Sequence, residues 1–172
     1  MLNKIGLFWL RDDFRFGQND GLIEATHNHD SVVVFYLYKQ EVFKEQQAQK
    51  WWLNKSLLNF QKKLNKLNIN LEIIETKSFK IFFDKLIKNK DFSIYWNKVY
   101  EPDFLKFDEY LLNNFKNKNI ISKRFKGNVL NETDEVKKND GSPFKVFTPF
   151  WRNAEKYYLE KIPSKNKTIK KC

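Results

Sequence analysis

The residues that could support catalysis are sparse in this chain and gather after one apolar run near its start. Asp12 and Asp13 follow the run 5–10 directly, and a carboxylate pair is what general acid–base chemistry uses. The alternative, which we favour, is that the pair caps loop turns or pairs with Arg11 and Arg15. No Ser-His-Asp or Cys-His set is evident, so we predict no catalytic residue in these 172 residues.

Metal and phosphate motifs are also absent from the sequence. His27 and His29 could form half a metal site, but no cysteine lies near them, and we interpret them as a solvated pair at a helix end. The five glycines build neither a Gly-x-Gly-x-x-Gly nor a Gly-Lys-Ser/Thr loop. The single cysteine is Cys172, which favours a reducing, cytoplasmic setting. We therefore expect no metal.

Aromatic residues, 17% of the chain, are the more informative chemical feature. One interpretation is core packing, because alternation along strands buries about half of them. The other is a pocket for a flat heteroaromatic ring, which aromatic side chains bind by stacking. The clusters in question are Phe35, Tyr36 and Tyr38, then Trp51 and Trp52, then Trp96 and Tyr100.

Length and charge limit the class of protein. A chain of 172 residues suits one domain with a core, and its mean hydropathy is −0.68. No stretch approaches the roughly 18 apolar residues of a membrane helix, and no signal peptide is evident. The net charge is +11, with 28 Lys and 4 Arg, so a nucleic-acid-binding protein remains one hypothesis.

Apolar runs of strand length alternate with helical patterns along the chain. This alternation predicts an α/β fold: a Rossmann-like, doubly wound, mostly parallel five-stranded sheet with helices on both faces. Ligands of such sheets bind at the carboxyl ends of the strands, near the switch in strand order. The predicted strands are 5–10, 32–38, 69–75, 92–97 and 119–125, and the predicted helices are 20–28, 50–67, 78–88 and 102–114.

The character of the chain changes after the fifth predicted strand. Residues 127–147 are polar and lack periodicity, and a further helix is expected from about Thr148. We therefore predict an α/β domain over 1–126 and a linker strap over 127–172. Residues 164–172 are rich in lysine and show no pattern that would complete a fold. We therefore expect that the sequence ends here because a longer protein has been cut.

Three segments, in order, resemble motifs of the DNA photolyase/cryptochrome family. Residues 8–16 with 19–22 resemble the Trp-Phe-Arg-Arg-Asp-Leu-Arg opening and the Asp-Asn-Pro-Ala-Leu run that follows it. Residues 95–102 resemble the Asn-Arg-x-x-Glu-Pro segment, and residues 145–151 the Tyr-x-Val-Phe-Thr-Pro-Phe motif. Together these matches span residues 4–156.

The resemblance implies an N-terminal domain that holds an antenna chromophore, joined by a linker to a helical domain that binds FAD and damaged DNA. In this family the antenna passes excitation energy to FAD, which repairs pyrimidine dimers. The implied function is light harvesting for a deoxyribodipyrimidine photolyase, and these 172 residues are expected not to be catalytic by themselves. Alternatives are a cryptochrome-type photoreceptor domain and a stand-alone nucleotide- or partner-binding module.

Departures from the family pattern bear on the chromophore. Asp12 replaces an Arg, Tyr38 stands where many relatives have an Asp that touches the antenna, and Asp103-Phe104 replaces the Asn-Glu pair of folate-binding members. The resemblance therefore favours FMN or a deazaflavin over methenyltetrahydrofolate. The candidate cofactor-binding residues are Arg11, Asp12, Phe35, Tyr36, Tyr38, Lys50, Asn97 and Glu101; for Asn97 and Glu101 a structural role in capping the next helix is equally open.

Overall fold

The computed structural model describes residues 5–39, 41, 47–132, 134–160 and 168–172, with the backbone alone over 157–160. The chain divides into two compact units, one of residues 1–127 with 167–172 and one of residues 128–166. The first unit thus runs to residue 127 and also includes the last residues of the chain. No helix of the described residues is long and apolar enough to cross a membrane.

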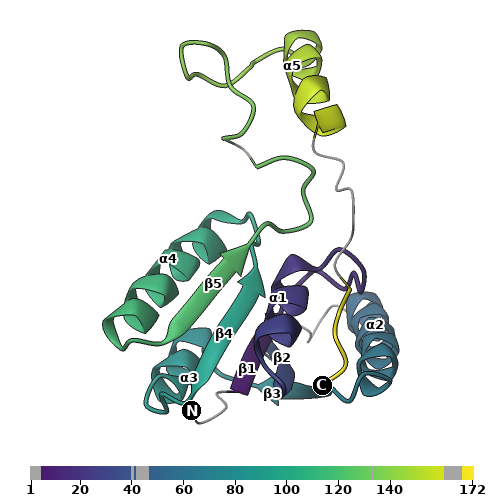
Figure 1. The fold of residues 1–172 in the computed structure, drawn as a ribbon, viewed down its shortest axis with the longest axis vertical. Coiled ribbons are helices and arrows are strands. Elements are labelled where there is room, and N and C mark those ends of the chain that lie inside the picture. Colours follow the sequence, from purple (N-terminus) through teal and green to yellow (C-terminus); the bar gives the residue numbers. More distant parts are fainter. Residues whose placement is uncertain (1–4, 40, 42–46, 133, 161–167) are drawn as a thin grey trace. The chain divides into compact units, whose positions relative to one another are not determined.

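The first unit is built on a five-stranded sheet of order β3-β2-β1-β4-β5 (Figure 1). All four strand pairings of the described residues are parallel, which confirms the predicted doubly wound α/β fold. Because β1 pairs with both β2 and β4, the strand order reverses between β1 and β4. The strands are β1 (Ile5–Leu10), β2 (Val32–Tyr38), β3 (Asn70–Glu75), β4 (Phe92–Asn97) and β5 (Ile121–Phe125).

Four helices cover the sheet, two on each face. Alternation along β1 sends Phe8 and Leu10 into the core under α1 and α2, and Trp9 into the core under α3 and α4. The second core is rich in aromatic rings, with Trp9 4.8 Å from Phe83 between ring centroids. The helices are α1 (Asp20–Asn28), α2 (Gln47–Asn65), α3 (Phe79–Leu86) and α4 (Pro102–Asn117).

Helix ends follow local chemistry. Asn19 caps α1, its side chain accepting a hydrogen bond from the Leu22 amide at 3.2 Å, and Pro102 occupies the first turn of α4. After α2 and α4 the chain turns through the left-handed residues Asn68 and Asn119, with φ of 59° and 57°. These turns shorten the third and fifth strands relative to the prediction, and α4 runs three residues past its predicted end.

The last residues pack on the first unit, contrary to the expectation that the ending completes no fold. Ile169 and Cys172 contact the core cluster of α1 and α2. The Cys172 amide donates to the Leu67 carbonyl at 3.0 Å, and the Lys170 amide donates to the Thr26 hydroxyl at 3.1 Å. The yellow segment in Figure 1 runs between α1 and α2. Residues 164–167 of the predicted tail lie outside the described residues.

Replacing Ile169 by Ala is expected to destabilise the first unit. The side chain is half-buried against an apolar cluster, so its truncation should lower the free energy of unfolding by about 1–2 kcal/mol, below the range for a fully buried site. Urea unfolding of the full chain measures the loss. The exposed neighbour Lys171→Ala is the control, and equal effects of the two changes would show that the segment is not anchored by Ile169.

The described part of the second unit includes a turn and a helix. Asp140 accepts hydrogen bonds from the amide and hydroxyl of Ser142 at 2.9 and 2.6 Å, and Gly141 has φ of 79°, a left-handed conformation that glycine adopts freely. The helix α5 (Phe147–Glu160) begins one residue before its predicted start. The Phe147 and Trp151 rings stack at 6.2 Å.

Candidate functional site: the carboxyl edge of the sheet

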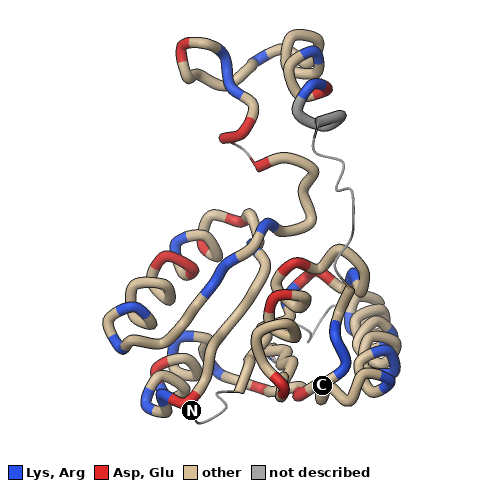
Figure 2. The backbone as a smooth tube through the Cα atoms, viewed as in Figure 1, with Lys and Arg blue, Asp and Glu red and all other residues tan. Residues whose placement is uncertain are grey.

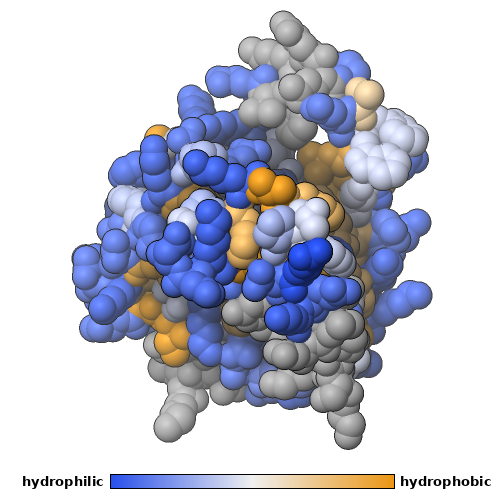
Figure 3. Space-filling view, turned by 90° about the horizontal axis from the view of Figure 1, so that it is seen from above, coloured by the Kyte–Doolittle hydropathy of each residue, from blue (hydrophilic) through white to orange (hydrophobic). Residues whose placement is uncertain are grey.

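The switch between β1 and β4 sets the place where a ligand of this fold is expected. Arg11, Asp12 and Asp13 follow β1 directly and Asn97 ends β4, so this edge carries four polar side chains. Seen from above, the described surface is mostly hydrophilic and is interrupted by small apolar patches (Figure 3). The described residues hold no group of three or more metal-ligating side chains.

Arg11 is held by a buried ion pair. Its guanidinium donates to both carboxylate oxygens of Asp108 on α4, at 3.0 and 3.2 Å, and to the Asn97 carbonyl. Only 7% of Arg11 and none of Asp108 is exposed. The guanidinium also lies 4.7 Å from the Trp9 ring centroid, so stacking holds its plane in place. Asp108 thus pairs with Arg11, whereas we had expected Asp12 or Asp13 to do so.

Burial shifts the titration of both partners. Desolvation lowers the pKa of the Arg11 guanidinium and raises the pKa of the Asp108 carboxyl, while the attraction between them opposes both shifts. A second cation, Arg124 on β5, lies 3.7 Å from Asp108. Asp108 therefore links β1, α4 and β5 beneath the edge of the sheet.

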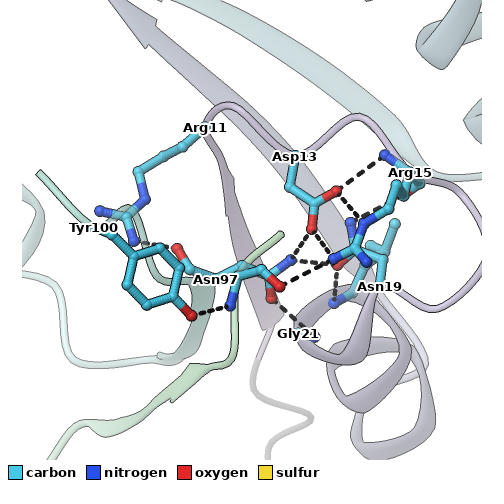
Figure 4. Close-up of polar contacts among 9 residues, drawn as sticks. Arg11, Asp13, Arg15, Asn19, Gly21, Asn97 and Tyr100 are labelled. Atoms are coloured by element: carbon cyan, nitrogen blue, oxygen red, sulfur yellow. Dashed lines mark hydrogen bonds and ion pairs between the residues drawn. The ribbon is translucent and has the colours of Figure 1, made fainter. Parts of the chain in front are cut away.

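Asn97 is the centre of a second polar cluster (Figure 4). Its amide nitrogen donates to Asp13 at 3.1 Å and to Asn19 at 3.0 Å, and its amide oxygen accepts from the Gly21 backbone at 3.2 Å. A Cβ at Gly21 would lie 2.6 Å from that oxygen, so this close approach requires glycine. These hydrogen bonds of the Asn97 side chain tie β4 to α1 and to the loop after β1, and not to the following helix.

Arg15, which Asp13 holds, and Tyr100 both bind the backbone of Gly127. Arg15 donates to both oxygens of Asp13, at 2.8 and 2.6 Å, and also to the Gly127 carbonyl at 3.2 Å. The Gly127 amide in turn donates to the Tyr100 hydroxyl at 3.1 Å. The expected pairing of Asp13 with Arg15 is thus observed. Because these groups hold one another, the protein itself fills the switch point.

The accessible part of the edge lies beside this cluster, at the ends of β1 and β2. Asp12 is exposed, and Tyr36 is half-buried next to Phe14, with 6.3 Å between the ring centroids. Burial, and then the negative charge of Asp12, raise the pKa of Tyr36 to about 12. Phe14 and Tyr36 thus pack together on the side of the sheet that α2 covers, and the charge of Asp12 acts on Tyr36.

The other sequence candidates differ in their surroundings. Phe35 is 3% exposed and packs on Phe82 and Phe83 in the opposite core, so its side chain is enclosed by protein. Tyr38 donates to Glu75 across the β2–β3 pair at 3.2 Å. Lys50 is exposed on α2, and Glu101 is exposed at the start of α4, where its side chain makes no capping hydrogen bond.

The two histidines diverge in their contacts. His27 is exposed, and its ring nitrogen lies 3.0 Å from the Thr168 carbonyl oxygen. His29 is half-buried, with a ring nitrogen 3.0 Å from the Tyr95 hydroxyl, so it is not the solvated side chain we expected. Both contribute to packing at the end of α1.

Sequence reasoning missed Asp108 as a member of the site. A usable signal was present, since Asp108 lies four residues after Phe104 and three before Leu111 on the apolar stripe of α4. A carboxylate on a buried helix face needs a cationic partner. The identity of that partner, 97 residues earlier in the chain, follows only from the fold.

Changing Asp12 to Asn is expected to lower the pKa of Tyr36 and leave it above its ordinary value of about 10, because burial, the larger cause, remains. Since the folded pKa is the higher one, the hydroxyl contributes its full stability below pH 10 and loses it as the pH rises from about 10 to 12. NMR titration of the tyrosine ring carbons, with Tyr36→Phe to assign the signal, measures the shift. An unchanged pKa in Asp12→Asn would remove Asp12 from the vicinity of Tyr36.

Comparisons with known proteins agree with this fold. The family model for DNA photolyase matches residues 6–167, and the chain therefore belongs to the DNA photolyase family. Its α/β unit is the N-terminal domain of that family, as the sequence motifs had indicated.

Both photolyases and cryptochromes are similar to this chain. The deoxyribodipyrimidine photo-lyase of Agrobacterium fabrum is 27% identical over 149 residues, which cover 87% of this chain and 31% of that protein. Cryptochrome-2 of Arabidopsis thaliana is 24% identical over 164 residues, covering 94% of this chain and 27% of that protein. The chain thus spans less than a third of the length of these relatives.

Solved structures show the same fold. A class III photolyase from Agrobacterium tumefaciens superposes with a TM-score of 0.78 at 24% identity, over 100% of this chain and 36% of that one. An archaeal photolyase from Sulfolobus tokodaii, described with two FAD molecules and a novel light-harvesting cofactor, gives 0.73 at 20% identity, over 97% and 37% of the two chains.

Proposed function

We propose that this chain is the antenna-chromophore-binding part of a deoxyribodipyrimidine photolyase, and that it collects near-UV and blue light for FAD-dependent repair of pyrimidine dimers. Family membership gives the coarse assignment. The single observation that carries the finer one is the partly exposed group of Asp12, Phe14 and Tyr36 at the carboxyl ends of β1 and β2. FAD and DNA would bind to the helical domain that the family resemblance implies.

The residues present fit a flavin. The Tyr36 ring offers a face for stacking, the Asp12 carboxylate can accept hydrogen bonds from ring nitrogens, and the exposed Lys50 on α2 suits a phosphate group. When bound, the chromophore would supply light absorption. The protein would supply stacking, orientation and partial exclusion of water.

FMN or a deazaflavin remains favoured over methenyltetrahydrofolate. Asp103 and Phe104 stand where folate-binding members carry an Asn-Glu pair, and Phe104 is turned inward, its ring 5.6 Å from the Arg11 guanidinium. The Sulfolobus photolyase supports a flavin in this role by analogy, since it is described with a second FAD. A cryptochrome-type photoreceptor is the second candidate, favoured by the similarity to cryptochrome-2.

Quenching of FMN fluorescence by the chain, compared among variants, tests the location of the site. Tyr36→Leu keeps an apolar contact with Phe14 but removes the stacking ring, so we expect affinity to fall about fivefold. Lys50→Ala is expected to weaken binding and reduce its salt dependence. Tyr110→Leu is the control, because Tyr110 packs on Phe107 on the opposite face of the sheet. Equal losses in all three variants would contradict the proposed location.

A further inference from the structure

The outer face of α2 combines exposed tryptophans with lysines. Trp51 and Trp52 are 59% and 68% exposed, although tryptophan is among the side chains most stabilised by burial. Their ring centroids lie 6.4 Å apart, tilted by 40°. The inner face of the same helix is fixed in the core by Leu57, Phe60 and Leu64, so these two rings belong to a surface that the fold itself leaves uncovered.

The charge on this face has one sign. Residues 47–66 contain no Asp or Glu, and α2 is coloured only blue and tan in Figure 2. The exposed lysines of the outer face are Lys55, Lys62, Lys63 and Lys66, whereas Lys50, seven residues before Leu57, lies beside the buried stripe. The Lys55 ammonium lies 5.7 Å from the Trp51 ring, so cations and aromatic faces are interleaved. Such a surface attracts a polyanion and repels a basic partner.

The spacing places these groups in a row. Trp51, Lys55 and Lys62 lie on one stripe of the helix, and Trp52 and Lys63 lie on the adjacent stripe. At a rise of about 1.5 Å per residue, the row from Trp51 to Lys62 is about 16 Å long. That length matches a short segment of an extended polyanionic chain, with rings at one end and ammonium groups along the remainder.

We propose that the outer face of α2 binds single-stranded nucleic acid, with bases stacked on Trp51 and Trp52 and phosphates paired with the lysines of this face and of the residue that follows the helix, Lys55, Lys62, Lys63 and Lys66. Stacking needs unpaired bases, and a duplex keeps its bases within its own stack. An anionic membrane fits less well, because an interfacial helix inserts a whole apolar face and the apolar face of α2 is buried in the core. Lysines without arginine act as point charges, which predicts little preference for sequence.

This inference stands apart from the antenna proposal, since it needs neither a chromophore nor repair. Anisotropy of a labelled 12-nucleotide oligo-dT, titrated with the full chain over a range of salt concentrations, tests it. We expect saturable binding, quenching of tryptophan fluorescence, and weaker affinity for the matched duplex. The double variant Trp51→Ala with Trp52→Ala is expected to weaken oligo-dT binding at least tenfold, because each stacked base contributes about one to three kcal/mol.

Charge variants separate this face from the general positive charge. The triple change Lys55→Gln, Lys62→Gln and Lys66→Gln should reduce the slope of log K against log salt by about 2, and the affinity about 50-fold at 0.15 M salt. The control is the triple change Lys85→Gln, Lys88→Gln and Lys90→Gln. These three lysines are exposed on and after α3, and their replacement removes the same amount of charge. Equal losses in both triples, or equal affinity for oligo-dT and duplex, would overturn the proposal, as would displacement of oligo-dT by FMN.

Discussion

Replacement of Asp108 by Asn is expected to lower the free energy of unfolding by about 3–5 kcal/mol, one of the two largest losses in this chain. The change removes the negative partner of Arg11 and leaves a buried guanidinium uncompensated, which costs far more than the loss of one hydrogen bond. It also removes the buried one of the two anions beside Arg124, 3.7 Å away, and leaves the exposed Glu109 at 2.8 Å. Chemical denaturation followed by tryptophan fluorescence measures the loss.

Two further variants identify the cause. Asp103→Asn alters an exposed carboxylate in the first turn of the same helix, and we expect a change below about 0.5 kcal/mol. The double variant Arg11→Met with Asp108→Leu removes both charges and should be more stable than Asp108→Asn alone. A loss below about 1 kcal/mol in Asp108→Asn would show that the pair is not the buried link between β1 and α4.

Replacement of Asn97 by Leu is the second large effect that we expect, a loss of about 3–4 kcal/mol. Leucine has a similar volume but leaves the Gly21 amide, Asp13 and Asn19 without the buried amide that they share. Since this cluster starts α1 and holds the loop after β1, the variant should also weaken binding at the carboxyl edge.

The comparison of Asn97→Asp with Asn97→Leu separates shape from charge. Aspartate keeps an acceptor for the Gly21 amide but places a carboxylate against Asp13, so like-charge repulsion should raise the pKa of the new carboxyl. The deficit of Asn97→Asp should therefore shrink as the pH falls towards about 4, whereas that of Asn97→Leu should not. Asn113→Leu, at an exposed position of α4, is the control. If Asn97→Leu lowered the free energy of unfolding no more than Asn113→Leu does, the structural role of Asn97 would be contradicted.

Periodicity and strand-length runs were sufficient to predict the sheet and its helices. Three strands have their predicted bounds, because uninterrupted apolar runs such as 92–97 can only be buried on both faces. The predicted starts of the third and fifth strands were wrong by one or two residues. They follow Asn68 and Asn119, whose left-handed backbone conformation is only weakly indicated by residue type.

The site was less predictable, because its contacts join distant parts of the chain. Strand-end reasoning placed Asp12 and Tyr36 near one another, but it could not show that Arg11 and Asn97 are held by protein groups 97 and 76 residues away. It also ranked Phe35 with its neighbour Tyr36, although alternation along β2 sends the two side chains to opposite faces. The packing of Ile169 on α1 and α2 had no local signal in a Lys-rich tail.

The central claim, that the carboxyl edge of this sheet binds an antenna chromophore, is tested most directly by a titration of the purified chain with FMN, a deazaflavin and methenyltetrahydrofolate, followed by absorbance and fluorescence. We expect saturable binding of FMN or the deazaflavin at micromolar concentration or tighter, weaker binding of the folate, and loss of affinity in Tyr36→Leu. Binding of none of the three by a chain that unfolds cooperatively would contradict the antenna assignment and favour a stand-alone module built on the same fold.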